Sequence, residues 1–347
     1  MSEALILSVI VPVYNGERYL TDILRKISQQ TFKEYEVLFI NDGSTDASID
    51  LLRKAQKEDA RIRVFNQDNH GICAARNTGL RNAQGEYVIF IDQDDDFDAG
   101  MFEDYVQKIT VDHTDMYIFG KHCKTLDNDR IIEEKDVCPD DKICSGKQEI
   151  SPYVVNIDGR NMLLTVWNCI YKKELLDSRQ IIFDEQFTHG YEDTMFNIEA
   201  AMAGRSIGMC SNVHYQYFMR YESSTIKKKN PYLLQDVTYF CEKLKKKIVE
   251  YDADLLGECD LYIIRFFTKV YLKEKPHGFK EKKVLVKNIC EKRILQDACA
   301  GKLKKAQINK FYFEMLKMFA AGVAKKKYLQ TLFLLEILDM AMKCRRR

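Results

Sequence analysis

Four aspartates stand within five positions of the sequence, in the stretch FIDQDDDFD that begins at Phe90. They are Asp92, Asp94, Asp95 and Asp96. Like charges this close repel, and carboxylates near the edge of a core must be solvated, paired or bound to a cation. The cluster is therefore either a cation site or a solvated acidic turn that caps the helix expected from Ala99, since carboxylates favour helix N-termini.

The aspartate cluster is one of three polar segments that follow predicted strands. Apolar runs at residues 5–14, 35–40, 61–65 and 86–91 alternate with segments in which apolar residues recur at helical spacing. This alternation predicts an α/β fold, with a mostly parallel central sheet flanked by helices. The segments Pro12 to Asn15 and Asn41 to Ser44 and the aspartates all come at carboxyl ends of strands. Sheets of this kind bind ligands at that edge.

The remaining sequence divides into three parts. Residues 121–150 are polar and irregular, so we predict a loop or insertion there. From residue 163 the apolar pattern resumes, and it includes the aromatic strand VHYQYFM. After Tyr232 the spacing becomes largely helical, with one break at Pro276-His277-Gly278.

Charge is distributed unevenly along the 347 residues. Residues 1–227 hold 25 Lys and Arg against 38 Asp and Glu, a net charge of −13, whereas residues 228–347 hold 28 against 14, a net charge of +14. We therefore expect a first domain over residues 1–227 and a basic helical region over residues 228–347. Cationic, aromatic helices suit an anionic membrane surface, and the alternative is packing as a cap on the first domain or on a dimer mate. The overall charge of +1 indicates no nucleic-acid partner.

The sequence indicates a cytoplasmic protein, with a peripheral contact on the inner face of the membrane as an option. Its eleven cysteines form no CxxC pair, which favours reduced thiols. The first apolar run is too short for a cleavable signal and lacks a basic segment before it. No run of about 18 uncharged apolar residues is present, so no spanning helix is expected.

Six motifs in fixed order resemble those of family 2 glycosyltransferases with the GT-A fold, particularly bacterial enzymes that build surface polysaccharides. They cover about residues 5–225 and read SVIVPVYN, NDGSTD, NHGICAARNTGL, FIDQDDDF, WNCIYKKELL and GYEDTMF. Each motif is weak alone, but several lie at predicted strand ends. The resemblance implies transfer of a sugar from a nucleotide-diphosphate sugar, with UDP as the expected nucleotide, to a hydroxyl of a saccharide or lipid-linked acceptor.

The resemblance also answers what the aspartates hold. Asp92-Gln93-Asp94 matches the family's DxD element, which binds Mn²⁺ or Mg²⁺ against the donor diphosphate. Hard divalent cations take oxygen ligands, so two carboxylates, phosphate oxygens and waters can complete the coordination. Asp94 is the expected direct ligand, and Asp92 contacts the ribose or a metal-bound water. Asp95 adds a ligand or orients the donor sugar. His214 is either a further metal ligand, as in some relatives, or a packed strand histidine.

The resemblance assigns the nucleotide to the other strand-end segments. Pro12, Tyr14 and Asn15 line the base pocket. Asp42 accepts a hydrogen bond from the base or ribose, and an Asx turn is the structural alternative.

Four more residues are predicted to surround the donor. Gly71 lets the backbone approach the nucleotide closely. Arg76 supplies a planar charged donor or pairs with a nearby carboxylate, and Asn77 lies beside it at the pocket edge. Trp167 forms part of the sugar and acceptor floor or belongs to the core.

Arg220, with Ser223-Ser224 after it, matches a stretch that in relatives can reach the diphosphate. In GYEDTMF, Asp193 matches the catalytic base of the family, and Glu192 orients the acceptor or the base. An inverting transferase needs one carboxylate to accept the proton of the acceptor hydroxyl. The alternative is two exposed acidic residues at a helix N-terminus, which the helix dipole favours.

Two other functional classes stay open. A nucleotidyltransferase would need a phosphate loop rich in Gly, Lys and Arg after the first strand, and PVYNGERYL has too little of this. A non-catalytic, sugar-nucleotide-binding subunit would need no base, so Asp94 together with Asp193 argues against it. The processive Q-x-x-R-W motif is not in the sequence, which favours single additions.

Overall fold

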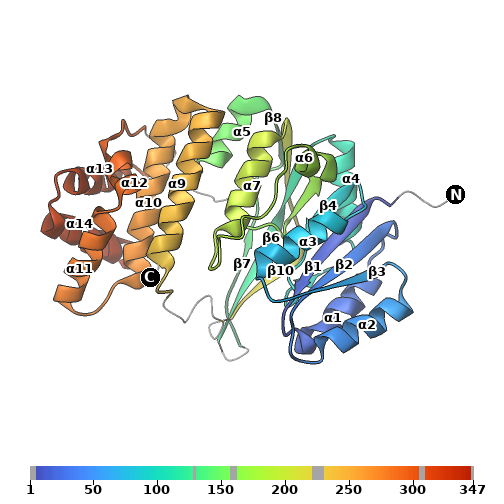
Figure 1. The fold of residues 1–347 in the computed structure, drawn as a ribbon. Helices are drawn as coiled ribbons and strands as arrows, with labels where there is room; N and C mark the ends of the chain where they lie inside the picture. The colour runs from blue at the N-terminus through green and yellow to red at the C-terminus, as the bar shows by residue number, and fades with distance from the viewer. Residues whose placement is uncertain (1–4, 128–129, 157–161, 221–229, 305–308, 345–347) are drawn as a thin grey trace. The chain divides into compact units, whose positions relative to one another are not determined.

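Buried strands alternate with helices along the first part of the chain in the computed structural model (Figure 1). The structure describes residues 5–127, 130–156, 162–220, 230–304 and 309–344. The chain forms two compact units, one of residues 1–150 with 162–228 and the other of residues 151–161 with 229–347.

The first half of the first unit is a run of strand–helix repeats. Its elements are β1 (Leu7–Val13), α1 (Glu17–Ser28), β2 (Tyr35–Asp42), α2 (Ser48–Glu58), β3 (Ile62–Gln67), α3 (Ile72–Asn82) and β4 (Tyr87–Phe90). The strands lie parallel in the order β3-β2-β1-β4. All residues of β1, β2 and β4 are buried, because helices cover both faces of such a sheet. Their continuous apolar sequences reflect this.

The second half extends the same sheet with antiparallel pairs. It contains β5 (Asp96–Phe97), α4 (Met101–Val111), β6 (Met116–Asp127), β7 (Arg130–Val137), β8 (Lys142–Ser145), the first part of α5 (Gly146–Val154, whose residues from 151 on belong to the second unit), β9 (Cys169–Lys172), α6 (Lys173–Ser178), α7 (Glu192–Ala203) and β10 (Ser206–Arg220). The order continues β4-β9-β6-β10-β5, and β9 is antiparallel to both of its neighbours. The predicted α/β fold with a helix-flanked central sheet is confirmed, and its parallel part is β3-β2-β1-β4 together with β6 and β10.

The loop predicted over residues 121–150 is wrong. Strand β6 runs on to Asp127 and forms a hairpin with β7, and β8 pairs with β10. Seven of the eight residues of β7 are exposed, so the strand shows no apolar alternation in its sequence. Charged residues are common on such edge strands because they discourage pairing with other chains.

The parallel register brings the polar strand ends together. Val13 of β1 lies opposite Asn41 of β2, and Asp42 lies opposite Gln67 of β3. The segments after β1, β2 and β4 therefore reach the same edge. Helix α3 packs on β1 and β2, so closely that a Cβ at Gly79 would lie 2.3 Å from Cγ2 of Ile10.

The second unit is helical, as predicted. After α9 (Leu233–Tyr251) and a short 3-10 turn it contains α10 (Leu256–Glu274), α11 (Phe279–Cys290), α12 (Arg293–Ala300), α13 (Lys310–Ala324) and α14 (Tyr328–Cys344). Most of α10 is buried against the other helices. Lys275 pairs with Glu336 at 2.9 Å and with Asp339 at 2.7 Å, which ties the end of α10 to α14. Within the described parts of the chain, none of the helices is both long and apolar enough to span a membrane.

Candidate active site

A cavity of about 370 Å³ lies at the carboxyl ends of β1, β2 and β4. Its lining residues are Pro12, Val13, Tyr14, Asp42, Asn69, Gly71, Ile72, Ala75, Asp92, Gln93 and Asp94. Six of these were predicted from the sequence, and they come from four segments, which follow β1, β2, β3 and β4 and include the three polar segments of the sequence analysis. Parallel strands place all four segments at one mouth.

Asn15 and Gln93 hold the loops around this cavity. The backbone of Asn15 is in the left-handed region, with φ of 48°, and its Oδ1 accepts from Thr45 N at 2.9 Å. Asn15 therefore fastens the NDGST loop and is not among the lining residues. Gln93 Nε2 donates to Tyr14 O at 3.0 Å, and Tyr14 N donates to Gln93 Oε1 at 3.2 Å. These contacts tie the middle residue of DxD to the end of β1, which the sequence did not indicate.

Asp42 shapes the loop that follows β3. Its Oδ1 accepts from His70 N at 2.9 Å and from Gln67 Nε2 at 2.8 Å, and its Oδ2 accepts from Gly71 N at 2.8 Å. Gly71 has φ of 87° and no atom within 4 Å of an added Cβ, so backbone conformation, not crowding, favours glycine there. Asp42 thus has a structural role and still faces the cavity.

Tyr215 of β10 contacts the aspartate cluster through its hydroxyl group. Its hydroxyl accepts from Asp92 N at 3.1 Å and donates to Asp95 Oδ2 at 2.9 Å. Burial, with the charges of Asp92 and Asp94, raises the pKa of the Asp95 carboxyl. Sequence reasoning missed Tyr215, because only the three-dimensional register of β10 shows which aromatic residue reaches the cluster.

The donor set at the cavity mouth fits a divalent cation bound together with a ligand. Asp92 and Asp94 contribute carboxylates to the lining, and their like charges create the repulsion that a cation offsets. Within the described residues, no group of three or more His, Cys, Asp and Glu side chains is arranged to hold a metal. Asp92 and Asp94 would hold such a cation, and oxygens of a bound ligand and of water would complete its coordination.

The structure does not bring His214 to this cluster. Its Nδ1 lies 2.9 Å from Asp98 Oδ1, and its Nε2 lies 3.0 Å from Asp104 Oδ2. Neighbouring residues of a strand point to opposite faces, so the residue that reaches Asp95 is Tyr215 and not His214. We therefore leave His214 out of the metal site.

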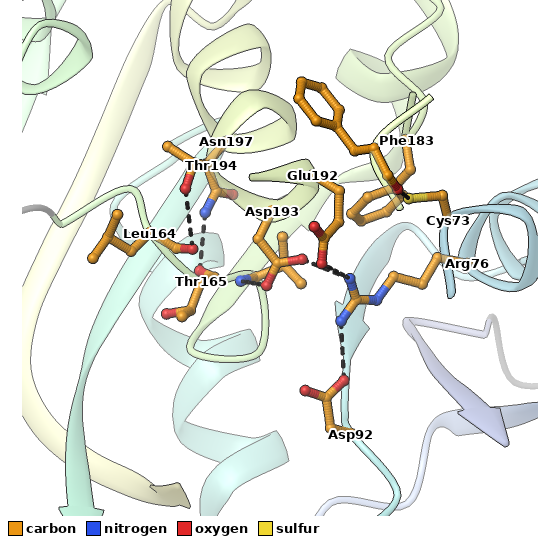
Figure 2. Close-up of polar contacts among 12 residues, drawn as sticks. Cys73, Arg76, Asp92, Leu164, Thr165, Phe183, Glu192, Asp193, Thr194 and Asn197 are labelled. Atoms are coloured by element: carbon orange, nitrogen blue, oxygen red, sulfur yellow. Dashed lines mark hydrogen bonds and ion pairs between the residues drawn. The ribbon is translucent and has the colours of Figure 1, made fainter. Parts of the chain in front are cut away.

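Arg76 of α3 joins the aspartate cluster to the acidic pair Glu192 and Asp193 (Figure 2). Its side chain is 1% exposed, and its guanidinium lies 3.0 Å from Asp92 Oδ1, 2.5 Å from Asp193 Oδ1 and 3.8 Å from Glu192 Oε1. Although burial lowers the pKa of Arg76, the three carboxylates raise it, so the group stays protonated. Of the two roles weighed for Arg76, the structure shows the carboxylate partner.

Glu192 and Asp193 open α7, where the helix dipole favours acidic groups. Asp193 Oδ2 also accepts from Val166 N at 3.3 Å. Burial raises the pKa of Asp193, with Arg76 acting in the opposite direction. Burial and the charge of Asp193 raise the pKa of Glu192 to about 7. The pair is mostly buried, so the alternative of two exposed acidic residues is wrong.

This raised pKa predicts a pH-dependent stability. Because the Glu192 carboxyl binds its proton more tightly in the folded than in the unfolded chain, stability falls as pH rises from about 4.5 to about 7. The Glu192→Gln variant has no carboxyl group at this position, so it does not lose stability in this way as the pH rises. We expect its melting temperature, relative to the unmodified chain, to be higher at pH 8 than at pH 5. The exposed Glu58→Gln serves as control, and an equal difference at both pH values would contradict the prediction.

Two other predicted residues, Asn77 and Trp167, are described by the structure and do not line the cavity. Asn77 is buried, and its Nδ2 donates to Phe183 O at 2.8 Å while its Oδ1 accepts from Phe183 N at 2.8 Å, so it fixes the 183–185 segment and does not lie at the pocket edge. Trp167 is 3% exposed and stacks on Tyr215, which favours the core role. Arg220 ends β10, and its side chain lies outside what the structure describes, as do Ser223 and Ser224.

Comparison with known proteins identifies the family. Residues 8–176 match the family model for glycosyl transferase family 2. The uncharacterized glycosyltransferase EpsJ of Bacillus subtilis is 28% identical over 75% of this chain and 75% of that protein. TarS of Staphylococcus aureus, a poly(ribitol-phosphate) beta-N-acetylglucosaminyltransferase, is 29% identical over 62% of this chain and 36% of that protein.

Two solved structures show the fold. The crystal structure of TarS 1-349 in complex with UDP-GlcNAc has a TM-score of 0.71 at 19% identity and covers 97% of this chain and 92% of that chain. That of GalNAc-T7 with UDP, GalNAc and Mn²⁺ has a TM-score of 0.52 at 14% identity and covers 83% of this chain and 55% of that one. Residues 8–176, which include every residue that lines the strand-end cavity, therefore belong to the family 2 glycosyltransferases, and the chain has the GT-A fold.

Proposed function

We propose that the chain is an inverting, metal-dependent hexosyltransferase of bacterial surface-polysaccharide synthesis. It moves a sugar from a UDP-sugar to a hydroxyl of a saccharide or lipid-linked acceptor. The observation that carries the proposal is the single buried guanidinium of Arg76 between Asp92, at the cavity mouth, and Asp193. This contact sets a donor-binding carboxylate beside a candidate base, an arrangement that group transfer needs and simple binding does not.

The cavity is the proposed donor site. Tyr14 is 47% exposed and lines the cavity together with Asp42 and Gly71, and these residues are the proposed contacts of the base and ribose. The TarS structure contains UDP-GlcNAc, and GalNAc-T7 contains UDP and Mn²⁺, which supports a UDP donor and a divalent cation here. Mn²⁺ or Mg²⁺ held by Asp94 and Asp92 would neutralise charge on the departing nucleoside diphosphate.

The carboxylate of Asp193 is the proposed base. It accepts the proton of the acceptor hydroxyl while that oxygen attacks the anomeric carbon from the side opposite the nucleotide, so one displacement inverts the configuration. Arg76 and the Val166 N–H orient the carboxylate and favour its ionised form. Glu192, with one carboxylate oxygen buried and lacking a hydrogen-bond partner in the described chain, orients the acceptor.

A donor screen tests the proposal. The purified chain is incubated with Mn²⁺ and the UDP-linked forms of glucose, galactose, N-acetylglucosamine and N-acetylgalactosamine, and nucleotide release is measured. GDP- and dTDP-sugars form the comparison. We expect metal-dependent release from at least one UDP-sugar. Turnover confined to GDP- or dTDP-sugars would contradict the UDP donor.

The basic second unit is proposed to contact the inner face of an anionic membrane, which would place a cytoplasmic enzyme near a lipid-linked acceptor. The helices α13 and α14 expose apolar side chains, namely Phe311, Met318, Leu329 and Phe333. Exposed Lys325, Lys326 and Lys327 join the two helices. Each basic residue near such a surface contributes about 1 kcal/mol, and the apolar side chains can enter the headgroup region.

Sedimentation with vesicles tests this contact. We expect binding to vesicles that contain phosphatidylglycerol, weaker binding to neutral vesicles, and loss of binding when Lys325, Lys326 and Lys327 become Gln. Lys54→Gln with Lys57→Gln removes exposed charges of the first unit as the control. Equal binding of both variants, or a stable dimer in light scattering with no vesicle binding, would contradict the membrane role.

A further inference from the structure

Lys121 is a buried cation that sequence reasoning missed, and the turn at Thr165 and Val166 links it to the candidate base. It lies on β6 opposite Tyr215 of β10, and its side chain is 9% exposed. Its Nζ donates to Thr165 Oγ1 at 2.7 Å and lies 4.8 Å from the centroid of the Trp167 ring. Among the described residues, no carboxylate lies within ion-pair distance of this ammonium.

Burial without an ion pair is costly for an ammonium group. The face of Trp167 offsets part of that cost by cation–π attraction. Burial lowers the pKa of Lys121, and the negative charge of Asp193 acts against that shift. Two adjacent residues, Thr165 and Val166, contact Lys121 and Asp193 respectively, so the two opposite charges attract each other in a buried setting.

The acceptor of the Lys121 hydrogen bond belongs to the turn that contacts Asp193. Thr165 Oγ1 donates in turn to Asn168 Oδ1 at 2.6 Å, and Asn168 Nδ2 donates to Phe119 O at 2.7 Å. Lys121 is thereby part of a network that fixes the turn to β6. The next residue of the turn, Val166, donates its N–H to Asp193.

The same turn is also attached to α7. Asn197 Nδ2 donates to Thr165 O at 2.9 Å, and Thr194 Oγ1 donates to Leu164 O at 3.4 Å (Figure 2). The turn is thus held between Lys121 on one side and the helix that carries the base on the other. A displacement of the turn changes the position of the Val166 N–H relative to the carboxylate.

We infer that Lys121 is a positioning residue for the transfer reaction: through Thr165 it fixes the turn against Asp193, and its charge favours the ionised form of that carboxylate. The inference rests on the proposed role of Asp193 as base. Lys121 acts through other groups and has no contact with the donor cavity in the described lining.

Several other groups influence the same carboxylate. Arg76 lies on α3, Asp92 follows β4, and Glu192 precedes Asp193 on α7. The other titratable groups that interact with this carboxylate are Cys73, Cys169 and Tyr171. Arg76 is the cation in direct contact, so the loss of Lys121 should shift the titration of Asp193 and not abolish its ionisation.

Three variants test the inference by steady-state transfer measured across pH. Lys121→Met keeps side-chain length and removes the charge. We expect kcat to fall about 10- to 100-fold, as for a slightly misplaced catalytic group. The acidic limb of the pH profile should move up by about 0.5 to 1 pH unit, because one nearby positive charge is lost. The donor KM should stay within about twofold, since the donor cavity is untouched.

The two companion variants separate charge from placement. Lys121→Arg keeps the charge, so its acidic limb should stay in place. Thr165→Val removes the hydrogen-bond acceptor and keeps the ammonium, so kcat should fall without a shift of the limb. If Lys121→Met destabilises the fold, the other two variants still test the inference. A purely structural Lys121 would lower the melting temperature in all three variants. It would leave the pH profile and the kcat of the folded fraction unchanged.

Failure of this inference is distinguishable from failure of the proposed function. Unchanged kcat and an unmoved acidic limb in Lys121→Met, with transfer lost in Asp193→Asn, would overturn the role of Lys121 alone. Transfer retained in Asp193→Asn would overturn the base assignment itself, and the inference about Lys121 with it.

Discussion

Asp193→Asn is expected to slow glycosyl transfer by about 10²- to 10⁴-fold, the usual contribution of a positioned base. The substitution keeps size and hydrogen bonding but removes the proton acceptor. Donor affinity should barely change, because Asp193 contacts Arg76 and is not part of the cavity lining. Affinity for UDP and the transfer rate are measured with the same donor.

A matched control uses Asp177→Asn, an exposed aspartate at the end of α6. Its kinetics should equal those of the unmodified chain. The product of the unmodified chain should carry the anomeric configuration opposite to that of the donor, as a single displacement requires. Near-normal transfer by Asp193→Asn, or a product with retained configuration, would exclude the proposed mechanism.

Asp94→Ala is expected to abolish the metal dependence of nucleotide binding. In the unmodified chain, Mn²⁺ or Mg²⁺ should strengthen UDP binding strongly, because Asp92 and Asp94 would hold the cation and its charge would offset that of the diphosphate. Without Asp94, one of the two carboxylates proposed to hold the cation is missing. Calorimetric titration of UDP with metal and in EDTA measures the difference.

The control for this variant is Asp22→Ala on the exposed face of α1, which should retain full metal dependence. Equal UDP affinity in metal and in EDTA for the unmodified chain would remove the DxD assignment. The two variants have different expected signatures, since Asp94 affects binding and Asp193 affects rate.

Much of the cavity could be predicted because parallel strands impose a simple rule. Buried apolar runs identify β1, β2 and β4, and the polar residues after them reach one edge irrespective of helix packing. Pro12, Tyr14, Asp42 and Asp94 follow from that rule together with the family resemblance. None of these predictions needed the contacts of individual side chains.

The contacts between distant segments could not be predicted from one sequence. Arg76 lies 117 positions from Asp193, and its choice of carboxylates depends on how α3 and α7 pack. Tyr215 and His214 are neighbours on β10, and the bulged register of that strand determines which of them reaches the aspartate cluster. Strand β7 was missed because its exposed residues show no apolar period. The sequence did not single out Lys121 as a site residue, because a lysine in a strand is usually solvated.

The most direct test of the central claim identifies which bond of a UDP-sugar breaks. The purified chain is incubated with each UDP-sugar that it binds, with Mn²⁺ or with EDTA, and the products are followed by phosphorus NMR. A second set of samples contains pyrophosphate. We expect UDP as the phosphorus-containing product, formed only with metal and independent of pyrophosphate. Sugar 1-phosphate formed with pyrophosphate would indicate a nucleotidyltransferase, and UDP-sugar that binds without any cleavage would indicate a non-catalytic subunit; either result would contradict a glycosyltransferase.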